Sequence, residues 1–297
     1  TEGMVLLKNE TNTLPMAKNV KNIAAFGITS YNFISGGTGS GDVNEEYTIS
    51  LAQGLSNAGY QMDADVKKAY TNYIDEENKK HPKKGFLEEF MNPSPPMPEY
   101  IIDNSLVSSK AAEADIALIT IGRNAGEGVD RKVANDFDLT ETEQNLINSV
   151  SNAFHAKNKK VVVVLNIGGV TEVASWRDKV DAILLAWQPG LEAGNAVADI
   201  LKGNVNPSGK LTSTFPVKYT DVPSANSFPG KNLSAEQVKG MGGFPMGYES
   251  EVTYEDGIFV GYRYYNTFNV KPAYEFGYGL SYTNFAYSKP RHNLQAT

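Results

Sequence analysis

The stretch that decides the fold is "KVVVVLNIG", residues 160–168. It is short, almost wholly apolar and rich in β-branched valine, a composition that favours a strand buried on both faces. Three further runs share this character: "NIAAFGI" at 22–28, "ADIALITIG" at 114–122 and "DAILLAW" at 181–187. Such strands are typical of a parallel sheet that is covered by helices on both sides.

Helical patterns fall between these runs. The segment "TETEQNLINSVSNAFHAK" opens with Thr140 and carries Glu143 three residues later, which is the signature of a capping box. Its apolar side chains recur at helical spacing on one face: Leu146, Ile147, Val150 and Phe154. Three further helices are expected at 48–59, 171–180 and 191–204. Strands that alternate with helices predict βαβ units, and therefore a layered α/β domain with a mostly parallel sheet.

Two regions interrupt this alternation. Residues 80–100 hold four prolines between 93 and 98, which excludes a helix or a central strand there and predicts a long surface excursion. Residues 220–250 are rich in Gly, Pro, Ser and Asn and are expected to be irregular. The segment from 259 to 288 is crowded with tyrosine and glycine, and predicts irregular loops and short strands.

Composition excludes several functions. The chain has 297 residues, a net charge of −7 and no cluster of basic residues, which argues against nucleic acid as a partner. No apolar run reaches membrane-spanning length, so no membrane partner is expected. Cysteine is absent and the three histidines are far apart, so the sequence offers no metal site. The first residue is Thr1 rather than methionine, which is typical of part of a longer polypeptide; the compartment, cytoplasmic or exported, stays open.

The first candidate site is the glycine-rich turn "GGTGSGD", residues 36–42, which follows the first buried strand. Such turns can hold a phosphate against a helix N-terminus. The dinucleotide-binding pattern does not fit, because Asp42 stands where a third glycine is needed, and no Gly-Lys-Ser/Thr follows. The residues leave three readings open: a flexible turn, a nucleotide site, and a turn in which Ser40 and Asp42 bind a polyhydroxyl ligand.

The second candidate is Glu127, in "IGRNAGEGVDRK" at 121–132. It comes just after a buried strand, and ligands of open α/β sheets bind outside the carboxyl ends of the strands. Gly126 and Gly128 on either side permit backbone conformations that carry an acid outward. The residues alone are equally compatible with a solvated loop glutamate that has no role.

Six motifs in fixed order extend these patterns. They are "EGMVLLKNETNTLPM", "GGTGSGD", "NAGEGVDRK", "KKVVVVLNIGGVTEVASW", "AILLAWQPGLEAGNAVADILKGNVNPSGKLTSTFP" and "VGYRYYNTFNVKPAYEFGYGLSYTNFAY". The set resembles the α/β-sandwich domain that follows the TIM barrel in glycoside hydrolase family 3, from Glu2 to about Tyr287. The resemblance implies a three-layer αβα sandwich over 1–287. It also implies a linker helix at the first residues, and at 288–297 a linker or the start of a following, fibronectin-like domain.

The resemblance further implies an activity, that of a retaining β-glycosidase of the β-glucosidase type. In that family a TIM barrel supplies an aspartate nucleophile and the sandwich domain supplies the general acid/base. The match places the acid/base on Glu127, with Ser40 and Asp42 as substrate-binding residues and with no cofactor. The expected partners are a β-glucoside or oligosaccharide and a barrel domain of the same enzyme; a homodimer stays open. Two alternatives remain: a non-catalytic carbohydrate-binding or scaffold domain, and a nucleotide-binding α/β domain.

Overall fold

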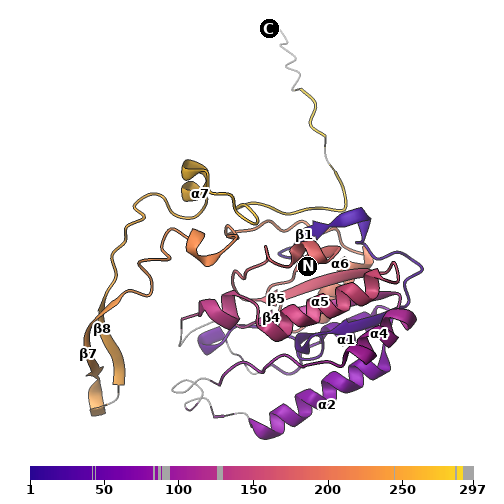
Figure 1. Ribbon diagram of the computed structural model, residues 1–297, viewed down its shortest axis with the longest axis horizontal. Helices are drawn as coiled ribbons and strands as arrows, with labels where there is room; N and C mark the ends of the chain where they lie inside the picture. Colours follow the sequence, from indigo (N-terminus) through magenta and orange to yellow (C-terminus); the bar gives the residue numbers. More distant parts are fainter. Residues whose placement is uncertain are drawn as a thin grey trace, which may run out of the picture.

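The computed structural model describes residues 1–41, 43, 45–82, 84–85, 88, 94–125, 130–243, 245–284 and 286–289. Its centre is a 6-stranded sheet in the order β1-β6-β5-β4-β2-β3 (Figure 1). Strand β1 pairs with β6 in antiparallel fashion, and the other pairings of this sheet are parallel. The strands are β1 (Val5–Asn9), β2 (Asn22–Phe26), β3 (Gln61–Met62), β4 (Ile116–Arg123), β5 (Lys160–Ile167) and β6 (Ala182–Leu185). All four predicted runs are strands of this sheet.

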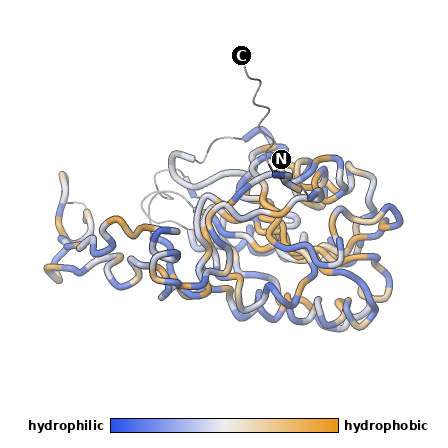
Figure 2. The backbone as a smooth tube through the Cα atoms, turned by 90° about the horizontal axis from the view of Figure 1, so that it is seen from above, coloured by the Kyte–Doolittle hydropathy of each residue, from blue (hydrophilic) through white to orange (hydrophobic). Residues whose placement is uncertain are grey.

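The sheet is covered by helices on both faces. Alternate residues of β5 point to opposite sides: Val161 and Val163 belong to one hydrophobic core, and Val162 and Val164 to the other. The first core is completed by side chains of α2 (Ala64–Lys80), α4 (Asn104–Glu113) and α5 (Glu141–His155). The second is completed by α1 (Leu51–Asn57) and α6 (Ala193–Lys202). The predicted three-layer αβα sandwich is therefore confirmed, and Figure 2 shows its hydrophobic segments gathered inside the body.

Local chemistry explains where these helices begin and how they pack. The capping box predicted for α5 is present, since the Thr140 hydroxyl accepts the Glu143 amide while Glu143 accepts the Thr140 amide. Helices α1 and α6 approach backbone to backbone. A Cβ added at Gly194 would lie 1.9 Å from the Ser50 carbonyl oxygen, and one at Gly54 would lie 2.1 Å from the Gly194 carbonyl carbon.

Several expectations about local structure were wrong. Residues 171–180 form turns and only the short helix η5 (Arg177–Lys179), because the Glu172 carboxylate accepts the Ser175 amide and so caps a turn. The first residues form the edge strand β1 rather than a linker helix. Region 220–250 is less irregular than expected, since it contains β7 (Lys231–Lys239) and most of β8 (Pro245–Glu251).

The remaining described elements are short. They are η1 (Glu10–Asn12), η2 (Ile28–Ser30), η3 (Gly39–Gly41), η4 (Val133–Phe137), η6 (Tyr219–Asp221), η7 (Met241–Gly243) and α7 (Tyr262–Phe268). Strands β7 and β8 form an antiparallel hairpin of their own, and Figure 1 draws this hairpin well away from the sandwich. Helix α7 lies in the tyrosine-rich segment where loops and short strands were expected.

Candidate functional site

The loops that follow β2, β4, β5 and β6 meet at one edge of the sheet, because these four strands are parallel. This carboxyl edge is where open α/β sheets bind ligands. The loop after β2 contains the glycine-rich turn, and the loop after β4 contains Glu127. The described parts of these two loops therefore lie at the same edge of the sandwich.

A buried asparagine holds two of these loops together. Asn166, near the end of β5, is fully buried. Its Oδ1 accepts the Ile34 amide at 2.7 Å, and its Nδ2 donates to the carbonyl oxygens of Ile34 at 2.9 Å and Trp187 at 2.8 Å. One side chain thus fixes the loop after β2 to the loop after β6. A further bond joins the same two loops, from the Gly190 amide to the Ser35 carbonyl oxygen at 2.9 Å.

The loop after β4 is anchored where it begins. The Arg123 guanidinium binds the Glu143 carboxylate through two bonds of 2.6 Å, and both side chains are largely buried. Its Nε also donates to the Asp136 carbonyl oxygen at 2.8 Å. A bidentate pair of this kind fixes direction as well as distance.

The same loop is anchored again after its tip. Arg131 Nε donates to the Asp136 carboxylate at 2.8 Å, and Arg131 Nη1 donates to the Val170 carbonyl oxygen at 2.7 Å. The Asp136 carboxylate also accepts the Lys132 amide at 3.0 Å. Arg123 is therefore fixed to helix α5, and Arg131 is fixed to the loop after β5.

The glycine-rich loop and the loop after β4 touch each other. The Thr38 amide donates to the Ala125 carbonyl oxygen at 3.3 Å. The loop after β6 contacts the loop after β4 as well, since Gln188 Nε2 donates to Asn124 Oδ1 at 2.8 Å. A Cβ at Gly37 would lie 2.6 Å from the Ala125 carbonyl oxygen, and one at Gly168 would lie 2.6 Å from the Ala125 Cβ. A side chain at Gly37 would meet the backbone of Ala125, and one at Gly168 would meet the side chains of Ala125 and Gln188, so both positions favour glycine.

A carboxyl group with a raised pKa lies beneath this edge. Glu99 is only partly exposed, and its carboxylate accepts the Ile28 amide at 3.1 Å, at the start of the loop after β2. Burial raises the pKa of Glu99 to about 7; the hydrogen bond from Ile28 opposes this effect, and the charge of Glu143 reinforces it. Glu99 thus places a largely buried carboxyl group next to the start of the glycine-rich loop.

The three predicted site residues are only partly covered by the structure. Glu127 and Asp42 lie outside the described residues, and for Ser40 the backbone alone is described, within η3. Their neighbours show that the two loops meet, through Thr38 and Ala125. Sequence reasoning missed Asn166, Arg123 and Gln188. The sequence did contain a signal for Asn166, because it is a polar residue inside an otherwise apolar strand.

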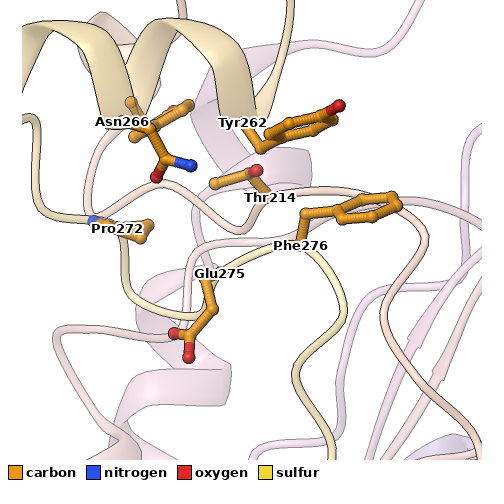
Figure 3. A pocket seen from close by; sticks show the side chains of 7 residues that line it. Thr214, Tyr262, Asn266, Pro272, Glu275 and Phe276 are labelled. Carbon is orange, nitrogen blue, oxygen red and sulfur yellow. The ribbon is translucent and has the colours of Figure 1, made fainter.

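A separate pocket of about 290 Å³ lies beside α7 (Figure 3). The rings of Tyr262 and Phe276 stack there with centroids 5.1 Å apart, and Thr214, Asn266 and Glu275 add polar groups. It is formed by residues 214 and 262–276, so it shares no residue with the loops described above. Within the part of the chain that the structure describes, no group of three or more His, Asp or Glu side chains is arranged to hold a metal ion.

The fold and its polar carboxyl edge define an αβα sandwich with anchored loops along that edge. Residues 4–282 match the family model described as "Glycosyl hydrolase family 3 C-terminal domain". This chain belongs to glycoside hydrolase family 3 and contains that C-terminal domain.

The relatives are longer proteins. The chain is 36% identical to beta-glucosidase A of Butyrivibrio fibrisolvens, over 96% of this chain and 34% of that protein. It is 33% identical to thermostable beta-glucosidase B of Acetivibrio thermocellus, over 97% of this chain and 32% of that protein. Beta-glucosidase 3B of Thermotoga neapolitana, solved in complex with glucose, is 45% identical with a TM-score of 0.84, covering 96% of this chain and 37% of that one. The chain thus spans about a third of the length of the relatives it matches.

No helix among the described residues combines the length and the apolar character that crossing a membrane requires.

Proposed function

We propose that this chain is the acid/base-bearing domain of a retaining β-glucosidase, with Glu127 as the general acid/base. The observation that carries the proposal is that Arg123 and Arg131, on either side of Glu127 in the sequence, are both anchored and that Ala125 contacts the glycine-rich loop, in a chain that belongs to glycoside hydrolase family 3. An acid used in catalysis needs a loop whose ends do not move, because small displacements of reacting groups are costly. The comparisons favour this function over the scaffold and nucleotide-binding alternatives.

The chemistry requires a second carboxylate. Retaining hydrolysis uses a nucleophile and an acid/base about 5 to 5.5 Å apart across the glycosidic bond. We propose that the nucleophile is an aspartate on a TIM-barrel domain of the same polypeptide, in the two thirds of the relatives that this chain does not match. Glu127 would protonate the leaving oxygen, then take a proton from water as the glycosyl–enzyme bond breaks. The barrel domain and a terminal β-linked sugar are the two partners of this proposal, which does not require a homodimer.

In this proposal the glycine-rich loop supplies the residues of the sandwich domain that bind the substrate. We assign Ser40 and Asp42 to the sugar, because the loop that carries them contacts the loop of Glu127 through Thr38 and Ala125. Hydroxyl and carboxylate groups are suitable partners for sugar hydroxyls. The same proposal treats 1–287 as the sandwich domain and 288–297 as a linker or the start of a following domain.

The experiment is Glu127→Gln in the full-length polypeptide, with Asp130→Asn as the matched control in the same loop. General acid catalysis contributes roughly 10²- to 10⁴-fold. We expect Glu127→Gln to lose about that much kcat/KM on glucosides with poor leaving groups and far less kcat/KM on activated aryl glucosides, which need little protonation. For the activated substrates kcat should still fall, because water then attacks the glycosyl–enzyme without a base. Azide should then restore turnover of the activated substrates and yield a β-glucosyl azide, whereas Asp130→Asn should stay close to the parent enzyme.

Two results would argue against this assignment. Equal losses of kcat/KM in Glu127→Gln for both classes of substrate would mean that this side chain does not protonate the leaving group. Hydrolysis of aryl β-glucosides above the buffer rate by the 297-residue chain alone would mean that no second domain is needed for the chemistry.

A further inference from the structure

One segment of the chain contributes nothing to the described cores, and its ring contact outside itself is that of Phe259 with Phe268 of α7. We call residues 228–260 the arm; it consists of the β7–β8 hairpin and its two flanks. None of its described residues is buried. More than half of the large apolar side chains that lie exposed among the described residues nevertheless fall in this arm or at the start of α7, among them Met241, Met246 and Ile258, which are 97%, 71% and 75% exposed.

An arm of this kind is not stable by itself in water. A lone two-stranded hairpin is marginal, because it has no third strand or helix to cover its apolar side chains. Both of its edges also present unpaired backbone groups. Clustered exposed apolar side chains of this extent mark an interface. The arm therefore requires a covering surface that lies outside the described residues.

The arm leaves the sandwich at its carboxyl edge. The ring of Tyr219, ahead of the arm, contacts the ring of Phe137 with centroids 5.8 Å apart. Phe137 closes η4, which follows the loop of Glu127. Figure 1 shows the hairpin on the side toward which α2 runs, and Figure 2 shows from above that it extends outward from the body. Whatever covers the arm also faces the carboxyl edge.

We infer that the arm docks onto the barrel domain of the same polypeptide and holds it against the carboxyl edge. This inference rests on the proposed function, since that function places the barrel opposite this edge. The length of the relatives supports this choice of partner: about two thirds of each lies outside the matched part, which is enough to cover both arm and edge. Met241 in the hairpin tip and Met246 on β8 are the anchors, because unbranched methionine adapts to an irregular apolar surface.

Cysteine labelling tests the docking. The chain has no cysteine, so single cysteines can be placed cleanly, and peptide mass spectrometry separates them from any cysteine upstream. Met241→Cys reports on the arm. Lys157→Cys is the matched control, because Lys157 is exposed and lies just beyond the C-terminal end of α5, at the opposite edge of the sheet. In the native full-length polypeptide we expect Met241→Cys to react roughly tenfold or more slowly than Lys157→Cys, since labelling then requires the interface to open.

Equal labelling rates would overturn the inference, as would protection that disappears on dilution, because the latter indicates a second copy of the chain. A second variant tests the anchors: the double change Met241→Glu, Met246→Glu should restore rapid labelling of a cysteine placed at Leu233. Ile101→Glu, at another exposed aliphatic residue outside the arm, should not. These rates do not depend on catalysis, so they can fail while the Glu127 substitutions succeed, and the reverse.

Discussion

Replacing Asn166 by leucine tests whether one buried amide holds the candidate site together. The side chain is fully buried and makes three hydrogen bonds, to the amide and carbonyl of Ile34 and to the carbonyl of Trp187. Leucine has a similar size but leaves all three main-chain groups without a partner. Each such buried group costs about 1 to 3 kcal/mol, and the apolar side chain recovers part of this, so we expect a loss of roughly 3 to 5 kcal/mol.

Urea unfolding measures this loss, with Asn57→Leu as the control. Asn57 also bonds an amide side chain, Asn195, but it does so at the surface, so its replacement should change stability by less than about 0.5 kcal/mol. Asn166→Asp tests the direction in which the unfolding free energy changes with pH. The new carboxylate would face two carbonyl oxygens, so burial and repulsion raise its pKa. The variant should therefore lose stability as pH rises. A loss below about 1 kcal/mol for Asn166→Leu would refute the reasoning.

Three further outcomes follow from the same contacts. Glu99 has a pKa of about 7 when folded and 4.5 when exposed, so the folded state retains a proton that the unfolded chain releases between these values. Its contribution to stability is therefore complete below pH 4.5 and falls by up to about 3 kcal/mol as pH rises to about 7; Glu99→Gln should remove this slope in urea midpoints measured from pH 4 to 8. Glu143→Gln weakens the partner of a largely buried arginine and should cost about 3 kcal/mol, whereas Lys80→Met, which removes the exposed lysine of the pair with Glu77, should leave the urea midpoint close to that of the parent; equal losses would contradict the difference in burial between Arg123 and Lys80. Gly194→Ala should cost about 2 kcal/mol or more in thermal unfolding, because its Cβ meets the backbone of Ser50, while Gly3→Ala, where no atom lies within 4 Å, should be neutral.

The sequence alone was sufficient to predict the sandwich fold, but it did not predict the polar side chains that anchor its loops. Continuous valine-rich runs identify buried strands, and the pair Thr140 and Glu143 marks the start of α5, because both are local signals. Helix α2 was not predicted from the sequence, because only Val66, Tyr70 and Ile74 are buried on an otherwise polar helix. The expected helix at 171–180 has apolar spacing that also suits a turn capped by its own side chains.

The anchors of the site are non-local. Asn166 stands 132 positions from Ile34, and Arg123 stands 20 positions from Glu143. No periodicity or spacing rule connects such partners, so a polar residue inside a strand indicates only that some partner exists. The position of Glu127 could be marked from the resemblance, whereas the contacts that hold its loop could not.

The anchoring residues and the residue proposed for catalysis should respond differently to substitution. The bonds of Arg123, Arg131 and Asn166 lie at the ends of the loops and below them, where burial strengthens them. In the sequence, Glu127 lies between Arg123 and Arg131, and Ser40 and Asp42 follow Ile34, which Asn166 holds. A change at an anchor should therefore alter both unfolding free energy and turnover, because it moves the ends of a loop. A change at Glu127 that preserves its size should alter turnover alone. If substitutions at the anchoring residues and at Glu127 changed unfolding free energy and turnover in the same way, the anchors would not be what positions the loops.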